Sequence, residues 1–186
     1  GCRVVRICVP DRNGAIADIV PGYDDIRDFE TGSERFFGAL IGRYGNRIGG
    51  ASFPLDGDTV RLTANECLAG CPGHLHGGTK NFANRIWESR VETNRVVMSL
   101  VSEDGDQGYP GELCVEAVFD FDDDNALEIT YLARTDKTTV VNLTNHVYFN
   151  LAGEGSGSVL DHELRLNSSK ILEMNERQIP TGKLLD

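Results

Sequence analysis

The residues from Val140 to Leu151 carry the side chains best suited to acid–base chemistry and to holding a polar ligand. If they form a β-strand, alternation separates a histidine, a tyrosine, a threonine and two asparagines from a row of apolar residues. The polar face would hold Asn142, Thr144, His146, Tyr148 and Asn150, and the apolar face Val141, Leu143, Val147, Phe149 and Leu151. When one face of a strand is covered by the core, its other face usually carries ordinary solvent-exposed residues and not a row of aromatic and amide side chains around a histidine. The row around His146 therefore predicts the floor of a polar binding cleft.

The net charge of −11 over 186 residues limits the class of partner. Nucleic acids and anionic membranes both require a concentrated basic surface, so the sequence favours a neutral small ligand over either of them. A composition of 40% hydrophobic and 25% charged residues is ordinary for a globular protein with one sizeable core.

The odd number of cysteines and the lack of long apolar runs indicate the cellular compartment of the protein. Five cysteines cannot all pair within one chain: Cys2, Cys8, Cys67, Cys71 and Cys114. No signal peptide is visible, and no apolar run reaches the length of a membrane-spanning helix. These features predict a reduced, cytoplasmic environment.

Both ends of the sequence are interpreted as cut, because a strand pattern begins at Val4 without a preceding Met and a turn closes the chain at Asp186.

Strand patterns dominate the rest of the chain. Ala51–Leu55 and Thr59–Leu62 flank Asp56-Gly57-Asp58, and an Asp-Gly pair suits the tight turn of a hairpin. Alternation also predicts strands at 96–101, 113–121 and 127–131, with an acidic turn at 122–125 between the last two. No segment has a helical stripe of convincing length. We expect an all-β antiparallel fold, a sandwich formed by one domain or by part of one.

Two further clusters could carry chemistry. In Gly42–Gly50, two arginines and an asparagine lie among glycines that allow the backbone to approach a ligand. The alternative is a tight connection in which the arginines cap carbonyls or pair with acids. Asp104–Glu112 could hold calcium through its acids, but it lacks the ligand spacing of a helix-loop-helix calcium site. An ordinary surface loop is favoured there.

A zinc site is a rival interpretation of the histidines. His-x-His in a strand places both rings on one face, and two cysteines lie just upstream. The four residues would be Cys67, Cys71, His74 and His76. Their spacing, C-x3-C-x2-H-x-H, matches no zinc motif that ligand geometry justifies, so the zinc site is disfavoured.

These motifs together resemble the aldose 1-epimerase (galactose mutarotase) family. The resemblance runs through almost the whole chain, in ordered segments: Val9-Pro10-Asp11, Gly42-Arg43 with Asn46-Arg47-Ile48, Leu75-His76-Gly77-Gly78, Trp87, Gly105–Gly111, Asn142–Leu151, Asp161-His162-Glu163 and Ile179-Pro180-Thr181-Gly182. It implies a large antiparallel β-sandwich, the galactose mutarotase-like supersandwich, of which 1–186 would be the N-terminal and central part. It also implies interconversion of the α and β anomers of free aldoses, without metal or organic cofactor.

The family's reaction opens and recloses the sugar ring. A base must remove the proton from the anomeric hydroxyl while an acid protonates the ring oxygen. Histidine suits the acid role because its ordinary pKa lies near neutral pH. By resemblance, His146 is this acid and His76 is the second histidine near the ring oxygen. Asn46 and Arg47 resemble the pair that holds the sugar hydroxyls, and Tyr148 lies in the family's binding strand, where its ring could cover an apolar sugar face.

The sequence also departs from the family pattern. Tyr44-Gly45 replaces the usual Val-Ala, and Asn65–Gly73 is longer than usual. The family's general base is a glutamate near the end of a much longer chain, and none of Glu163, Glu173 and Glu176 matches its motif. The alternative function is therefore a sugar-binding or structural module without catalysis. A phosphorylated sugar is disfavoured, because no further basic cluster accompanies the histidines.

Overall fold

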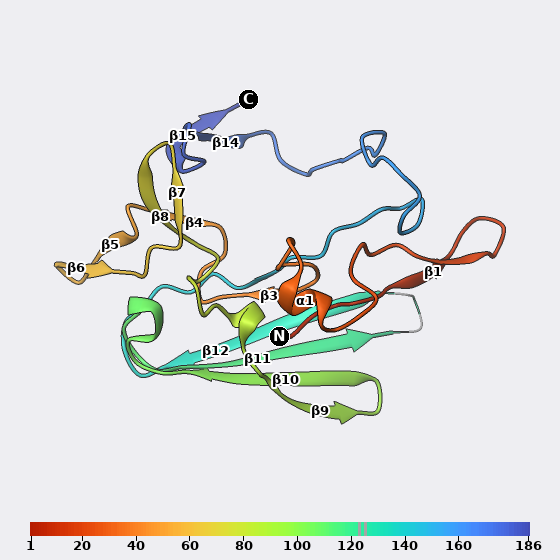
Figure 1. The fold of residues 1–186 in the computed structure, drawn as a ribbon, viewed down its shortest axis with the longest axis horizontal. Helices are drawn as coiled ribbons and strands as arrows, with labels where there is room; N and C mark the ends of the chain where they lie inside the picture. Colours follow the sequence, from red (N-terminus) through yellow and green to blue (C-terminus); the bar gives the residue numbers. More distant parts are fainter. Residues whose placement is uncertain (123, 125) are drawn as a thin grey trace. The chain divides into compact units, whose positions relative to one another are not determined.

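The computed structural model describes residues 1–122, 124 and 126–186, and its regular structure is mostly antiparallel β-sheet (Figure 1). Two compact units divide the chain. The first contains Gly1–Cys2 and Ile41–Leu143, and the second contains Arg3–Leu40 and Thr144–Asp186. The expected all-β class is confirmed. The expectation of one domain over residues 1–186 is not tested by this division and stays a prediction.

The largest sheet belongs to the first unit and has the strand order β12-β11-β10-β9. Its strands are β9 (Glu88–Glu92), β10 (Arg95–Ser102), β11 (Leu113–Phe121) and β12 (Leu127–Thr135). The sequence pattern predicted β10, β11 and β12, and this prediction is confirmed. One face of β11 is buried through Leu113, Val115 and Ala117. In the acidic turn predicted at 122–125, Asp123 and Asn125 lie outside the described residues.

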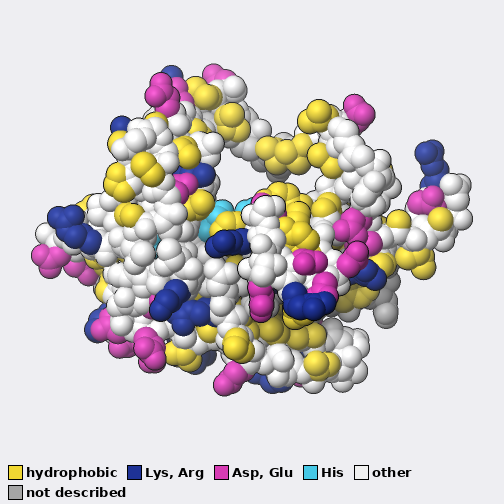
Figure 2. All heavy atoms as spheres, in the orientation of Figure 1, with side chains coloured by type: hydrophobic (Ala, Val, Ile, Leu, Met, Phe, Trp, Pro, Cys, Tyr) yellow, Lys and Arg dark blue, Asp and Glu magenta, His cyan; other side chains and the backbone are white. Residues whose placement is uncertain are grey.

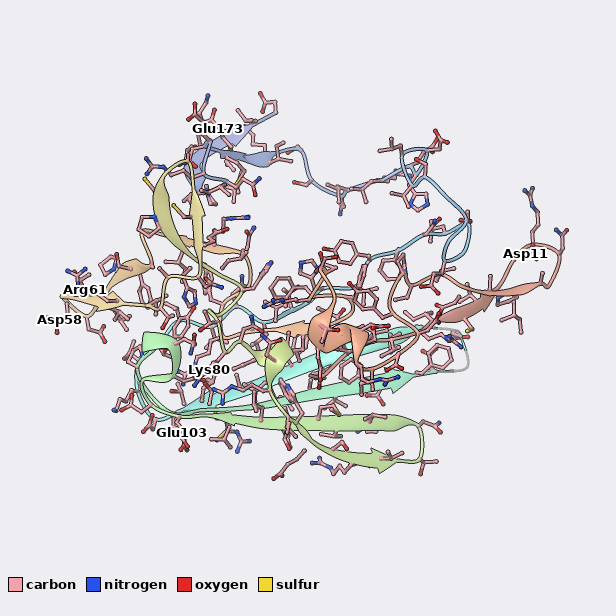
Figure 3. The ribbon with its side chains drawn as sticks, in the orientation of Figure 1. Asp11, Asp58, Arg61, Lys80, Glu103 and Glu173 are labelled. Carbon is pink, nitrogen blue, oxygen red and sulfur yellow. The ribbon has the colours of Figure 1, made fainter. Side chains whose placement is uncertain are left out.

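Two smaller sheets complete the first unit. One has the order β4-β8-β7, with β4 at Arg47–Gly49, β7 at Glu66–Leu68 and β8 at Cys71–Leu75. The other is the predicted hairpin of β5 (Ser52–Leu55) and β6 (Asp58–Arg61), in which Leu55 lies opposite Asp58. Asp56 and Gly57 take positive φ angles of 52° and 91°, as a tight hairpin turn requires. Figure 3 shows Asp58 and Arg61 on this hairpin.

The first unit is stabilised by a small apolar core. Ala51, Leu62 and Tyr109 are buried together, and partly buried residues surround them: Tyr44, Ile48, Phe53, Val60 and Val140. Burying a large apolar side chain contributes about 1.5–3 kcal/mol. Of the two short 3-10 helices of this unit, η1 (Phe82–Asn84) lies between β8 and β9, which belong to different sheets, and η2 (Asp106–Gly108) lies between β10 and β11 of the large sheet. Tyr44, in the loop before β4, packs against this core.

The second unit has shorter elements. They are β1 (Cys8–Pro10), β2 (Ile16–Asp18), α1 (Asp28–Thr31), β13 (Thr144–Asn145), β14 (Ile171–Met174) and β15 (Pro180–Leu185), while β3 (Leu40–Ile41) falls at the boundary of the two units. β1 pairs with β2, and β14 pairs with β15, both antiparallel. A strand beginning at Val4 was expected, but the described strand begins at Cys8.

The continuous strand expected over Val140–Leu151 is wrong. Only Thr144–Asn145 is a strand, because the backbone of this segment bonds to several separate stretches instead of one long neighbour. The Asn142 N–H donates to the Arg43 carbonyl, the His146 N–H to Ala39, and the Asn150 N–H to Ile19. Asn150 is 3% exposed and donates its side-chain amide to Gly157, so it is a structural residue rather than part of a polar row.

Apolar side chains remain exposed in the second unit. Leu160 is 90% exposed and Leu164 is 83% exposed, and Figure 2 shows hydrophobic side chains at the surface along the segment that leads to β14. Among the described residues, no helix has the length and apolar character needed to cross a membrane. The described parts of both units thus present sheets, hairpins and loops. Four of the candidate site residues, Asn46, His76, His146 and Tyr148, lie in loops, and Arg47 is the first residue of β4.

Candidate functional site

Asn46 and His76 are held together by the pairing of β4 with β8. Asn46 directly precedes β4 and His76 directly follows β8, and Arg47 lies opposite Leu75 in the ladder. The Asn46 N–H donates to Nδ1 of His76 over 2.9 Å, and the His76 N–H donates to the Asn46 carbonyl over 3.0 Å. Both residues have positive φ, 62° and 52° respectively. Non-glycine residues adopt this conformation at an energetic cost, often at functional sites.

A close approach of two backbones fixes the loop after His76. Gly77 has φ of 86°, and a Cβ there would lie 1.7 Å from the Gly42 carbonyl oxygen. Only glycine fits this position, since any other residue would clash with backbone. Leu75 is anchored from the other side, because the Asn65 side chain accepts from its N–H over 2.7 Å and donates to its carbonyl over 2.9 Å.

Arg47 joins this group through its side chain. Its Nη1 donates to Oδ1 of Asn46 over 3.2 Å. Its Nε lies 2.8 Å from Oε1 of Glu66, but the N–H does not point along that line, so the contact is an ion pair without a linear hydrogen bond. Asn46, Arg47 and His76, all predicted from the sequence, thus form one cluster within the first unit.

Arg43 has the structural role of the alternative interpretation, in which an arginine caps carbonyls. It is 2% exposed, and its guanidinium donates to the carbonyls of Ser102, Glu103 and Pro110 at 2.8–3.1 Å. Its Nε also donates to the Ser102 hydroxyl. Buried guanidinium groups require such partners, so Arg43 connects the loop after β10 to the loop before β4 and is not available to a ligand.

His74 is a buried structural histidine. Nδ1 lies 2.7 Å from the Thr63 carbonyl and Nε2 lies 2.8 Å from the Tyr109 hydroxyl, so Nδ1 carries the proton and Nε2 accepts. Burial lowers the His74 pKa, although the bond to Thr63 partly opposes this shift. Both ring nitrogens are therefore occupied in the neutral form.

The expected common face for His74 and His76 is not formed, because β8 ends at Leu75 and strand alternation stops there. Cys67 lies opposite Pro72, while Cys71 lies opposite Leu68, so the two thiols point to opposite faces of the hairpin. In the described part of the chain, no group of three or more His, Cys, Asp or Glu side chains is arranged to hold a metal ion. The geometry of His74, Cys67 and Cys71 does not fit the rival zinc site.

The acidic loop Asp104–Glu112 uses its carboxylates within the first unit. Asp104 accepts from the Gly111 N–H over 2.6 Å and pairs with Lys137. Asp106 accepts from the Ser102 hydroxyl and pairs with Arg85. These contacts account for both carboxylates as structural groups, in agreement with the favoured surface-loop interpretation.

His146 and Tyr148 lie together in an aromatic cluster of the second unit. Their ring centroids are 5.0 Å apart, and the His146 ring stacks on Phe36 at 5.5 Å with an angle of 26° between the planes. Phe37 meets Tyr148 edge-on at 5.3 Å. Two backbone bonds fix His146 in place, since its N–H donates to Ala39 and its carbonyl accepts from Gly38. The expected placement of the two rings on one side is confirmed.

Glu34 lies close to the Tyr148 hydroxyl. Partial burial raises the Tyr148 pKa, and the neighbouring Glu34 carboxylate raises it further. Tyr148 is 39% exposed, and its hydroxyl stays protonated near neutral pH. The cluster therefore presents a protonated phenol beside an imidazole, with apolar ring faces around them.

Sequence reasoning missed three neighbours of the candidate residues: Phe36, Glu34 and Glu66. Phe36-Phe37 immediately before Gly38 is a visible aromatic pair, but nothing in the sequence links it to His146, more than one hundred residues later. Glu66 lies in Asn65–Gly73, the segment that departs in length from the family pattern. A cavity of about 490 Å³ on the large sheet contains none of the candidate residues; it is lined by Ser99, Val101, Cys114, Glu116, Leu132 and Arg134, among others.

Comparisons with known sequences agree on one family. A family model described as aldose 1-epimerase matches residues 1–186. The chain is 42% identical to galactose mutarotase of Bos taurus over 184 residues, which is 99% of this chain and 52% of that protein. It is 37% identical to aldose 1-epimerase of Escherichia coli, over 97% of this chain and 51% of that protein. The chain spans about half the length of the curated relatives it matches.

Solved structures support the fold. A crystal structure of an aldose epimerase homologue from C. elegans superposes with a TM-score of 0.87 and 30% identity, covering 98% of this chain and 54% of that one. Galactose 1-epimerase from Lactobacillus acidophilus has a TM-score of 0.75 at 24% identity, over 91% of this chain and 49% of that one, which shows the fold alone. The expected galactose mutarotase fold, over part of its length, is confirmed.

Proposed function

The chain belongs to the aldose 1-epimerase family, and from this premise we propose that it serves the interconversion of the α and β anomers of free aldoses such as galactose and glucose. In this reaction the sugar ring opens, the aldehyde rotates and the ring recloses, so a proton must leave the anomeric hydroxyl and another must reach the ring oxygen. The substrate is a neutral small molecule, in keeping with the acidic composition of the chain.

The observation that carries the proposal is the cluster of Asn46, Arg47 and His76. Because Nδ1 of His76 accepts the Asn46 N–H, neutral His76 carries its proton on Nε2 and is a hydrogen-bond donor through that atom. Arg47 adds donors with fixed planar geometry, which suit neighbouring hydroxyl groups. We assign these three residues to sugar binding, with His76 also close to the reacting oxygen.

We assign His146 the role of acid and Tyr148 a role in sugar binding. Stacking on Phe36 and two backbone bonds restrict the His146 ring, and a restricted imidazole can return a proton to the same place in every cycle. Tyr148 offers its ring to an apolar sugar face and a protonated hydroxyl to a sugar oxygen.

The second candidate function is a sugar-binding or structural module without catalysis. It is favoured by the coverage of about half of each relative, because the resemblance places the general base in the half that this chain does not match. Glu173 does not supply a substitute, since it pairs with Lys183 and accepts from the Thr181 hydroxyl (Figure 3). A cytoplasmic location and a single domain over 1–186 remain part of the proposal.

Polarimetry with α-galactose tests the two candidates. The first sample is the 186-residue chain, and the second is the same chain joined to the half of the Bos taurus galactose mutarotase that it does not match. We expect no acceleration by the chain and clear acceleration by the fusion, because removing a general base costs about 10²- to 10⁴-fold. A folded fusion without activity would favour the module. Activity of the chain alone would place the base among its own carboxylates.

A further inference from the structure

Glu66 and Arg47 form an ion pair that spans three strands. Arg47 begins β4 and Glu66 begins β7, and β8 lies between these strands in the sheet. The guanidinium Nε is 2.8 Å from Oε1 of Glu66, and the two side chains are only 17% and 14% exposed. Charges shielded from water to this degree interact more strongly than exposed pairs. The ion pair therefore affects the orientation and the net charge that Arg47 offers to a ligand.

Gly73 makes this contact possible. In the ladder it lies opposite Glu66 on one side and opposite Gly49 on the other, so all three positions share one face of the sheet. A Cβ at Gly73 would lie 3.1 Å from Oε1 and 3.2 Å from Cγ of Glu66. Because Gly73 has no side chain, the Glu66 carboxylate can lie across β8 and reach Arg47.

One ion pair and one hydrogen bond restrict the guanidinium. Oε1 of Glu66 lies at Nε, and Oδ1 of Asn46 accepts from Nη1 over 3.2 Å. The carboxylate also supplies one negative charge for the one positive charge of Arg47. The group that faces the ligand is therefore a donor of hydrogen bonds whose net charge is cancelled locally.

We infer that Glu66 is a positioning and specificity-determining residue: it orients Arg47 and cancels its charge, so that the Asn46–Arg47–His76 cluster accepts uncharged aldoses and rejects sugar phosphates. The inference rests on the proposed function, since it requires that this cluster bind sugar. A hydroxyl needs only the oriented donors. A phosphate dianion would meet the Glu66 carboxylate as well, and specificity often depends on such a repulsive element.

The test compares the binding of galactose and of galactose 6-phosphate to the 186-residue chain by isothermal titration calorimetry. Glu66→Gln removes the charge and keeps the shape. Glu66→Asp keeps the charge on a shorter side chain, and Gly73→Ala leaves Glu66 in place in the sequence but crowds its carboxylate. Glu92→Gln is the matched control, because it removes the same charge from an exposed pair with Arg90 on β9.

We expect Glu66→Gln to weaken galactose binding by a factor of about 3 to 10, since Arg47 loses its orientation, and to shift the Kd ratio of the two sugars at least 10-fold toward the phosphate. Glu66→Asp should restore the rejection of phosphate, and Glu92→Gln should leave the ratio unchanged. The side-chain Nε–Hε resonance of Arg47 should move in Glu66→Gln and in Gly73→Ala but not in the control. A general loss of folding would not produce this selective pattern.

Two negative outcomes are distinguishable. If the unchanged chain binds galactose and Glu66→Gln leaves the Kd ratio the same, the inference is overturned and the proposed function stands. If the unchanged, folded chain binds neither sugar, the proposed function is overturned together with the inference. Should Glu66→Gln fail to fold, an unchanged ratio and an unmoved Arg47 resonance in folded Gly73→Ala would overturn the inference by themselves.

Discussion

Asn46 and His76 exchange two hydrogen bonds, from the Asn46 N–H to the imidazole Nδ1 and from the His76 N–H to the Asn46 carbonyl. The pair therefore determines both the place of the ring and its tautomer. The neutral ring must carry its proton on Nε2, because Nδ1 is an acceptor. An Asn46 substitution would disturb His76 as well as any direct contact between Asn46 and sugar, so the effects of the two positions should not be additive.

Replacing His146 with Gln tests the acid. In the fusion with the unmatched half of the bovine galactose mutarotase, His146→Gln should lower kcat by a factor of about 10² or more and change KM little, since the proton moves only in the transition state. Stopped-flow polarimetry over a range of galactose concentrations measures both constants. Phe36→Leu is a useful companion, because it removes the stacking partner and leaves the imidazole. An unchanged kcat in His146→Gln would exclude this residue as the acid.

Replacing Arg47 with Ala tests sugar binding. Arg47→Ala in the same fusion should mainly raise KM, by about 10-fold or more, because the hydroxyls are held in the ground state and in the transition state alike. Arg47→Lys should recover little, since lysine lacks the planar fork of donors. Arg61→Ala, on the β5–β6 hairpin, serves as the control (Figure 3). A fall in kcat alone, with KM unchanged, would contradict the assigned role.

The buried His74 should make stability depend on pH. Its pKa is lowered in the folded state, so between that value and the ordinary value of 6.5 the unfolded chain binds more protons than the folded chain. The contribution of neutral His74 to the free energy of unfolding is therefore fully present above about pH 6.5, and it falls as the pH drops below that value. Urea unfolding at pH 7.5 and pH 5.5 measures the difference. In His74→Asn, which can still donate to the Thr63 carbonyl, the difference should shrink; equal differences would refute the prediction.

Zinc should be absent from the purified protein. Both ring nitrogens of His74 are occupied, and Cys67 and Cys71 point to opposite faces of their hairpin. We expect less than stoichiometric zinc by mass spectrometry and no change in Tm on adding a chelator, since a structural zinc would contribute directly to folding. The double variant Cys67→Ser, Cys71→Ser should have the same Tm as the unchanged chain. One zinc per chain, lost together with stability on chelation, would revive the rival site.

The exposed leucines of the second unit should promote self-association. Leu160 and Leu164 are 90% and 83% exposed, and clustered apolar surface of this kind favours contacts between molecules. The 186-residue chain should elute from size-exclusion chromatography ahead of the position of a compact monomer. Leu160→Ser with Leu164→Ser should shift elution toward that position, while exposed Ile86→Ser in the first unit should shift it less. A monomeric unchanged chain would show that these residues do not associate.

The sequence predicted the local elements of the fold well. The Asp-Gly turn between β5 and β6 depends on two adjacent residues, and alternation in β10, β11 and β12 reflects one buried face. The strand prediction for 140–151 failed because alternation shows which side chains would share one face of a strand, but it does not show which stretches of backbone lie beside that strand. Its backbone bonds to several separate stretches, and no pattern within the segment could predict that.

The candidate site was predictable in its residue types and not in its contacts. The motif around His76 and the Asn46-Arg47 pair were visible, and the ladder of β4 with β8 brings them together. The Glu66 contact depends on the strand order β4-β8-β7 and on a glycine between two strands, which are properties of the sheet. Arg43 and Arg47 look alike in the sequence, yet one is buried against carbonyls and the other lies in the cluster.

The β7–β8 hairpin also offers a position for a fluorescent dye that would report sugar binding. Cys71 lies on the face of the sheet that carries Glu66 and Arg47, whereas Cys67 lies on the opposite face. An environment-sensitive dye on Cys71, with Cys8, Cys67 and Cys114 changed to Ser, should change its fluorescence when sugar binds. The same dye on Cys67, with Cys71 changed instead, should stay silent. The two cysteines of one hairpin thus supply a labelled variant that reports sugar binding and a matched control variant.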